Sequence, residues 1–190
     1  MKHPIDPKVD CVFKVLFGDP ENRDLLIHFL NATLIAELSG PIVWVEIIDL
    51  HNARETRLDK LSVVDVKAVD HHGRIFQIEV QVRSYGHLPY RIAHTWCDIY
   101  SAQLQSGKDY PSLLPTYSIW LLAENLIQDD AGYVHNYKLR DEFGRLLLDN
   151  GGIYLLELEK FRMERIETDE QRWIKFFRDG ESLNDEAYLL

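Results

Sequence analysis

The chain is poor in cysteine, poor in positive charge and without long apolar runs, and each shortage excludes a class of protein. Its 190 residues include two cysteines, Cys11 and Cys97, which leaves neither a disulfide framework nor a paired Cys-x-x-Cys motif for structural zinc. The charged N-terminus lacks the apolar segment of a signal peptide, and the longest apolar stretch, near residues 119–122, is too short to span a bilayer. We therefore expect a cytoplasmic protein with no membrane segment.

The shortage of positive charge bears on nucleic-acid binding. With 21 Lys and Arg against 31 Asp and Glu, the net charge is -10, whereas proteins that coat DNA neutralise phosphates with many basic residues. Residues 1–95 carry 11 basic and 13 acidic side chains, so most of the negative charge lies in the second half. Generic DNA coating is disfavoured, and a local positive groove in the first half remains open.

Hydrophobic residues make up 46% of the chain, which suffices for one well-buried core and predicts a single domain over residues 1–190. Apolar spacing predicts two short helices separated by the Gly18-Asp19-Pro20 break. Further along, the pattern predicts strands at 42–50, 61–69, 75–82, 117–123 and 153–156, and helices at 90–105, 137–148 and 171–178. The sequence contains no Gly-rich phosphate loop and no nucleophile elbow, so no small organic cofactor is expected.

The strands at 61–69 and 75–82 form the clearest predicted hairpin. If a loop of His71, His72 and Gly73 pairs Asp70 with Arg74, one face of the hairpin is wholly apolar. The other face then presents a polar set: Asp65, Lys67, Gln77, Glu79 and Gln81. In this register Asp65 stands opposite Glu79.

Two carboxylates on facing strands, with Cβ atoms roughly 5 Å apart, destabilise a sheet unless a positive charge lies between them. A divalent cation would supply that charge, and Mg²⁺ accepts a shell of one or two carboxylates completed by water and phosphate. The alternative is that the polar face is simply solvated, with Lys67 or Arg74 compensating the acids. The spacing alone leaves both interpretations open.

The residues around this pair resemble a known family. The string Asp65-Val66-Lys67-Ala68, then Gly73, then Ile78-Glu79-Val80-Gln81, is similar to the recombination-promoting nuclease / putative transposase family of the PD-(D/E)XK nuclease superfamily. The opening Asp10-Cys11-Val12-Phe13-Lys14-Val15-Leu16-Phe17-Gly18 resembles the family's D-x-x-F-K-x-L-F-G motif. Further matches include Arg91, Tyr100, Gln103, Gly107 and Tyr110, so the resemblance covers at least residues 10–123.

The resemblance implies an α/β fold with a restriction-endonuclease-like core. This core is a mixed four-stranded sheet flanked by helices in the order α-β-β-β-α-β. It would occupy about residues 10–123, followed by an additional C-terminal α/β segment over 124–190. The chain ends in NDEAYLL without a cap or turn, which is compatible with a fragment of a longer protein.

The resemblance also implies an activity: metal-dependent endonuclease cleavage of DNA, linked to recombination or mobile elements. Asp65 and Glu79 map onto the residues that bind Mg²⁺, with Mn²⁺ as a substitute, and Asp10 maps onto the acidic residue of the first helix. The superfamily usually has Lys two residues after the Glu, where this chain has Gln81, as the family commonly does. Gln81 can hydrogen-bond the attacking water but carries no positive charge, which Lys67 or Lys14 is then expected to supply.

Partners follow from the same resemblance. The basic candidates for contacts to the nucleic-acid backbone are Lys14, Lys60, Arg83 and Arg91. A homodimer is expected, since one active site per subunit can address each DNA strand. Two alternatives stay open. One is RNA as the substrate; the other is a catalytically weak or inactive nuclease fold used for protein or nucleic-acid binding.

Overall fold

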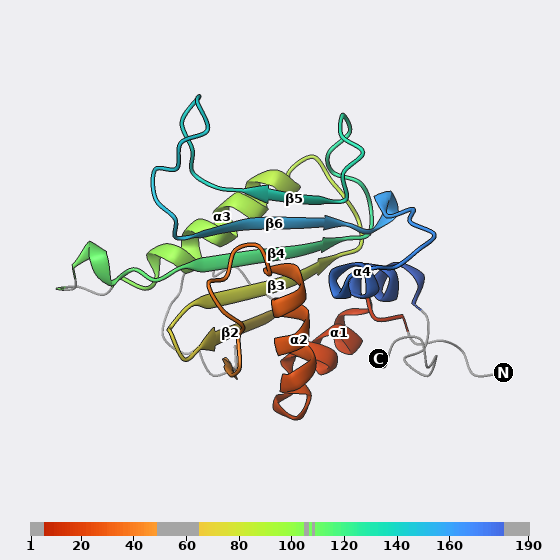
Figure 1. The fold of residues 1–190 in the computed structure, drawn as a ribbon, viewed down its shortest axis with the longest axis horizontal. Coiled ribbons are helices and arrows are strands. Elements are labelled where there is room, and N and C mark those ends of the chain that lie inside the picture. Colours follow the sequence, from red (N-terminus) through yellow and green to blue (C-terminus); the bar gives the residue numbers. More distant parts are fainter. Residues whose placement is uncertain (1–5, 49–64, 105–106, 108, 181–190) are drawn as a thin grey trace.

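A computed structural model describes residues 6–48, 65–104, 107 and 109–180 of the chain. Within these ranges, four α-helices and a six-stranded sheet account for most of the regular structure (Figure 1). In chain order the elements are α1 (Asp10–Gly18), α2 (Arg23–Thr33), β1 (Val45–Ile47), β2 (Val66–Asp70), β3 (Ile75–Gln81), α3 (Leu88–Ser101), β4 (Thr116–Leu122), β5 (Val134–Tyr137), β6 (Gly151–Glu157) and α4 (Asp169–Asp179). Short 3-10 turns lie at Pro20–Asn22, Tyr110–Ser112 and Leu158–Lys160.

The sheet is mixed and has the strand order β1-β2-β3-β4-β6-β5. β3 pairs parallel with β4, and β4 pairs parallel with β6, whereas the three remaining pairings are antiparallel. The predicted α/β class and mixed sheet are therefore confirmed, but the predicted count of four strands is wrong. The count differs because the C-terminal segment adds β6 and β5 to the same sheet, with Thr116 paired to Gly151 and Leu122 to Glu157.

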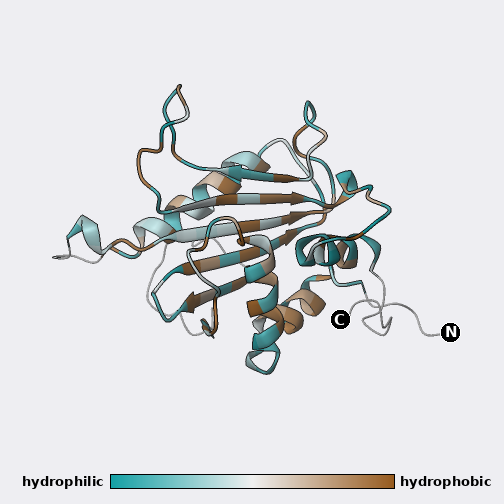
Figure 2. Ribbon diagram, viewed as in Figure 1, coloured by the Kyte–Doolittle hydropathy of each residue, from teal (hydrophilic) through white to brown (hydrophobic). Residues whose placement is uncertain are grey.

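Helices α1, α2 and α4 cover one face of this sheet (Figure 1). Their aromatic side chains interlock: the Phe17 ring lies 5.6 Å from Trp173 and 4.9 Å from Phe29, between centroids. The apolar stretches of the sequence concentrate on the central strands and on α1 (Figure 2). Each such aromatic pair adds about 1 kcal/mol beyond the area that it buries, so this layer is the main core of the protein.

Helix α3 covers the opposite face and connects β3 to β4. Because these strands are parallel, the chain needs a crossover between them, and α3 supplies it. Leu88 and Ile92 pack against Trp120, Leu122 and Leu155 of the sheet. The polar face of the predicted hairpin points toward this helix.

The hairpin register is the one that the sequence predicts. Val66 pairs with Ile78 and Ala68 with Phe76, and their face lies in the main core. At the turn, Asp70 Oδ1 accepts hydrogen bonds from the N–H groups of His72 and Arg74, and Asp70 Oδ2 lies 2.6 Å from Arg74 Nε. Gly73 takes a positive φ of 77°, which glycine adopts without strain.

The same turn occurs a second time, at Asp141-Glu142-Phe143-Gly144-Arg145. Asp141 Oδ1 again accepts from the N–H groups two and four residues later, Oδ2 lies 2.6 Å from Arg145 Nε, and Gly144 has a φ of 80°. Arg140 and Leu146 form a β-bridge on either side of it. The prediction of a helix at residues 137–148 is therefore wrong, because this turn folds the segment back on itself.

Most other predicted elements are confirmed with small shifts. The break at Pro20 separates α1 from α2, and Asp19 Oδ1 accepts the N–H of Glu21 there. The first predicted strand is shorter than expected, and residues 49–50 and 61–64 of the predicted strands lie outside the described residues. Within the described part of the chain, no helix has the length and apolar character needed to cross a membrane.

Candidate active site

A cleft lies at the edge of the sheet where β3 and β4 end. Since β2 runs antiparallel to β3, its first residues reach the same edge. The cleft has a volume of about 410 Å³ and is lined by Asp6, Lys8, Val9, Asp10, Asp65, Glu79, Val80, Gln81, Val82 and Arg91. In open α/β sheets ligands bind outside the carboxyl ends of the strands, so a ligand is expected at this edge.

Asp65 stands directly before β2, in the register that places it across from Glu79. Its Oδ2 accepts the N–H of Val80 at 3.2 Å, and its Oδ1 lies 3.7 Å from Lys14 Nζ. Burial raises the pKa of Asp65, and the Val80 N–H and the Lys14 ammonium only partly oppose this. The side chain is thus a half-buried carboxylate that an added positive charge would stabilise.

Glu79 is almost completely buried, with 2% of its surface exposed. Burial raises its pKa to about 7, against the opposing charge of Arg91. Its Oε1 accepts a hydrogen bond from Arg91 Nη2, and its Oε2 accepts one from Gln77 Nε2 at 3.0 Å. The negative charge of Asp65 contributes further to the raised pKa of Glu79.

A series of buried side-chain hydrogen bonds ends at Glu79. Trp120 Nε1 donates to Ser118 Oγ at 2.9 Å, Ser118 Oγ donates to Gln77 Oε1, and Gln77 donates to Glu79. All four side chains are buried between the sheet and α3. The alternative of a solvated polar face is therefore wrong for this stretch of the hairpin, because α3 covers it.

Helix α1 brings a third acid, Asp10, to the lining of the cleft, while Lys14 contacts Asp10 and Asp65 without lining the cleft itself. Lys14 Nζ lies 2.7 Å from Asp10 Oδ1, one helical turn away, and also faces Asp65. The hydrogen bond with Asp10 raises the pKa of Lys14, and the charges of Asp10 and Asp65 add to this. Asp10, Lys14 and Asp65 therefore form a connected charged row from α1 to β2.

Gln81 and Arg91 close the other side of the cleft. Arg91 Nη1 donates to Gln81 Oε1 at 3.0 Å, while Gln81 Nε2 donates to the carbonyl oxygen of Arg83 at 2.7 Å. The guanidinium of Arg91 lies over the Trp120 ring, 5.3 Å from its centroid. Residues 82–87 join the two groups, because they connect the end of β3 to the start of α3.

The structure does not bring every predicted residue into the cleft. Lys67 lies on the same face as Glu79 but pairs with Gln77 one step further from the edge, and it is absent from the described lining of the cleft. Burial lowers its pKa, and the charge of Asp98 on α3 opposes this. Arg83 is exposed on the loop after β3, and Lys60 lies outside the described residues.

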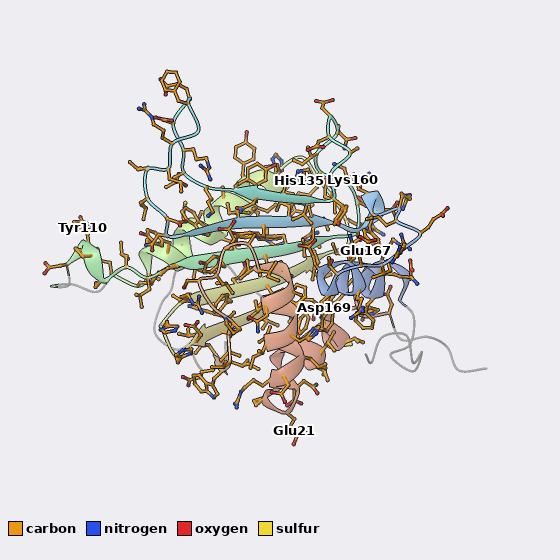
Figure 3. The ribbon with its side chains drawn as sticks, viewed as in Figure 1. Glu21, Tyr110, His135, Lys160, Glu167 and Asp169 are labelled. Atoms are coloured by element: carbon orange, nitrogen blue, oxygen red, sulfur yellow. The ribbon has the colours of Figure 1, made fainter. Side chains whose placement is uncertain are left out.

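A second buried glutamate, Glu157, ends β6 at the same edge of the sheet but is held differently. Its Oε1 accepts the N–H groups of Leu126 and Ile127, while Oε2 lies 2.9 Å from His135 Nε2 and 2.5 Å from Lys160 Nζ. Figure 3 shows His135 and Lys160 close together at this end of β6. Burial pushes the pKa of Glu157 upward, but these donors outweigh it, and the pKa lies below its ordinary value.

Comparison with known proteins now identifies the family. The family model described as PD-(D/E)XK nuclease family transposase matches residues 7–189. The chain belongs to this family. No curated protein and no solved structure matches the chain significantly. The matched range includes Asp65 and Glu79, the two acids that the resemblance in sequence assigns to metal binding.

PD-(D/E)XK nucleases generally use divalent metal ions, and the donor set of this cleft suits such an ion. Among the described residues, no group of three or more His, Cys, Asp or Glu side chains has the arrangement of a complete metal cage. Asp65 and Glu79 instead offer two hard carboxylates in a partly open cleft. That partial shell is the kind that Mg²⁺ accepts, because the ion retains water and takes phosphate oxygens as further ligands.

Sequence reasoning missed part of the site of this nuclease-family chain. It treated Arg91 only as a candidate phosphate contact, and it gave Gln77 no role beyond the polar face. Two signals for Gln77 were present: a polar residue in an apolar strand, and Ser118 in the similarly apolar Thr116–Leu122 segment. Arg91 had a weaker signal, namely its place in the first turn of the helix that follows the strand carrying Glu79.

Proposed function

We propose that this chain is a metal-dependent endonuclease that hydrolyses phosphodiester bonds in DNA. Asp65 and Glu79 would hold Mg²⁺, with Mn²⁺ as a substitute. When bound, the ion supplies charge neutralisation at the phosphate and acidifies a bound water. We further propose that the activity serves transposition or recombination, which is in line with the family, and that two copies act together when both strands are cut.

One observation carries this proposal. Two carboxylates from neighbouring strands share a cleft in which burial raises the pKa of each of them. Placing like charges together in a half-buried setting opposes folding, and the nearby Lys14 and Arg91 offset it only in part. A divalent cation, with its higher charge and oxygen preference, is the ligand that best relieves this arrangement.

The remaining residues have roles that their contacts define. The Val80 N–H and Lys14 orient Asp65 toward the cleft, and Gln77 fixes the plane of the Glu79 carboxylate. Asp10 holds Lys14 in place by their ion pair and lies at the rim of the cleft, where a water or a phosphate oxygen would approach.

The test is cleavage of supercoiled plasmid in Mg²⁺ or Mn²⁺ and in EDTA. Three proteins are compared: the natural chain, the Asp65→Asn variant and the Glu79→Gln variant. These substitutions keep the side-chain size and remove the charge, and circular dichroism shows whether each variant is folded. We expect nicking that requires metal and is lost in both variants. A matched control is Asp141→Asn, which removes a carboxylate from an exposed turn outside the cleft and should leave cleavage unchanged.

Other outcomes decide against the proposal in different ways. Cleavage that survives in both variants would place the activity elsewhere or in a contaminant. Absence of cleavage, together with absence of Mg²⁺ and Mn²⁺ binding by calorimetry, would favour the binding-module alternative. A parallel assay with RNA as the substrate distinguishes cleavage of DNA from cleavage of RNA.

A further inference from the structure

We infer that Arg91 is the catalytic cation of this site, in place of the lysine that Gln81 replaces, and that Gln81 is the residue that positions it. This inference rests on the proposed function and adds to it a group that contacts the scissile phosphate. It also changes the expected roles of three residues: Lys67 and Lys14 no longer supply the missing charge, and Gln81 no longer binds the water.

The contacts of Gln81 support its positioning role. Its amide oxygen accepts from Arg91 Nη1 at 3.0 Å, and its amide nitrogen donates to the carbonyl oxygen of Arg83 at 2.7 Å. Both ends of the amide are therefore engaged by the protein. A lysine at position 81 would bring its own positive charge to the cleft, whereas Gln81 holds the charge of Arg91 there.

Arg91 is also held from other directions. Its Nη2 donates to Glu79, its Nη1 lies 3.5 Å from the Tyr85 hydroxyl, and its guanidinium lies over the Trp120 ring. Its side chain nevertheless retains 40% exposure and lines the cleft. A guanidinium has five N–H donors in a rigid plane that matches phosphate oxygens, so this group is oriented by the protein while part of it still faces the substrate.

Three other lysines near the cleft, within the part of the chain that the structure describes, are engaged elsewhere. Lys14 forms an ion pair with Asp10 on its own helix, with 2.7 Å between Nζ and Oδ1, and lies on the Asp65 side. Lys8 Nζ donates to the carbonyl oxygen of Phe177 at 2.8 Å and lies 3.0 Å from Asp6. Lys67 lies under α3, one step back from the edge of the sheet. Among the described residues, Arg91 is the cation that contacts both Glu79 and Gln81, which stands at the position of the usual lysine.

The chemistry requires a charge at this point. In hydrolysis the oxygen of a water forms a bond to phosphorus while the bond from phosphorus to the leaving oxygen breaks. The proton that the water loses passes to solvent, and the leaving oxygen takes a proton from solvent. Negative charge on the non-bridging oxygens grows during this step, and a fixed guanidinium stabilises it without forming a bond or exchanging a proton.

The test measures kcat and KM for plasmid nicking in the natural chain, Arg91→Met, Arg91→Lys and the double variant Arg91→Met with Gln81→Lys. We expect Arg91→Met to lower kcat by about 100-fold or more while KM changes only a few-fold. The double variant restores a lysine at the usual position, and we expect it to recover at least about tenfold in kcat over Arg91→Met. The kcat of Arg91→Lys should lie between the kcat of Arg91→Met and that of the double variant.

Two controls separate a catalytic charge from a structural or phosphate-tracking role. Calorimetry should show that all four proteins still bind Mg²⁺, because Asp65 and Glu79 are intact. The kcat values are compared at saturating Mg²⁺, because the loss of Arg91 removes a hydrogen bond and an opposing charge from Glu79. A phosphate-tracking arginine would instead raise KM and leave kcat unchanged, and that result would overturn the inference. If Arg91→Met does not fold, Arg91→Lys still tests the inference because it keeps a positive charge at this position, and a folded Arg91→Lys with kcat below about 1% of the natural value would refute it.

The outcomes also distinguish this inference from the proposed function. If the natural chain does not cleave in either metal, the proposed function fails and the inference fails with it. If the natural chain cleaves and Asp65→Asn abolishes cleavage, but Arg91→Met has the natural kcat, the proposed function stands and only the role of Arg91 is wrong.

Discussion

The raised pKa of Glu79 makes the stability of the metal-free protein depend on pH in a predictable direction. A carboxyl whose pKa is higher in the folded state than in the unfolded state favours folding fully only below its unfolded pKa. This contribution is lost as the pH rises through the folded pKa, which for Glu79 is about 7. Replacing Glu79 with Gln removes the titration and leaves a neutral hydrogen-bonding side chain of the same size.

The size of the effect follows from the two pKa values. At 1.36 kcal/mol per pKa unit, the rise from 4.5 to about 7 corresponds to about 3 kcal/mol at high pH. Most of it, about 2.5 kcal/mol, develops between pH 5 and pH 8. We therefore expect the free energy of unfolding of Glu79→Gln, relative to the natural chain, to increase by about that amount over this range.

The assay is urea unfolding in EDTA at pH 5, 6, 7 and 8, followed by tryptophan fluorescence. Glu157→Gln is the matched control: it also replaces a buried glutamate at the end of a strand, but the pKa of Glu157 is lowered. That contribution is present above the unfolded pKa and lost as the pH falls through the lower folded pKa. The natural chain should thus be more stable than Glu157→Gln throughout this range. A constant difference between Glu79→Gln and the natural chain from pH 5 to 8 would refute the reasoning.

Three further predictions concern the fold. Asp70→Ala breaks a buried turn and should lower the free energy of unfolding by about 3 kcal/mol, whereas Asp141→Ala, in the exposed copy of the turn, should lower it by less than about 1 kcal/mol; equal losses in urea unfolding would contradict this. Trp173→Ala removes a nearly buried ring and should lower it by about 4 kcal/mol in the same assay, so a loss below about 1 kcal/mol would contradict the packing described. Gly151→Ala should lower the thermal midpoint sharply, because Gly151 has a φ of 88° and a Cβ would lie 2.1 Å from the Thr116 carbonyl oxygen; an unchanged midpoint would show that the two strands can separate.

The hairpin was predictable because its signals are local. Alternating apolar side chains fix which face is buried, and the Asp-x-x-Gly-Arg turn fixes the register, so the facing positions of Asp65 and Glu79 followed from the sequence. The same turn signal is present at residues 141–145, where apolar spacing wrongly favoured a helix. At residues 141–145 the repeated turn motif therefore predicts the local structure better than the helical spacing of apolar residues.

The rest of the site depended on tertiary structure. The sequence does not state which face of the hairpin α3 covers, so the burial of Gln77 and the raised pKa of Glu79 were not foreseeable from the alternation. The strand count was missed because β6 adds to the sheet through pairing with β4, which is distant in sequence. The contact of Arg91 with Gln81 requires the exact path of residues 82–87, which no pattern of polarity determines.

That connecting segment separates two kinds of group in one cleft. The carboxylates stand on strands within a rigid sheet, while Arg91 stands on a helix that the sheet reaches only through residues 82–87. The segment has its own anchor, since the Ser84 N–H donates to Glu124 Oε2 at 2.7 Å. Changing its length would move the cation relative to the acids without displacing either carboxylate. In the nuclease that we propose, the length of this segment would therefore tune the contact between Arg91 and Glu79, although the segment contains neither residue.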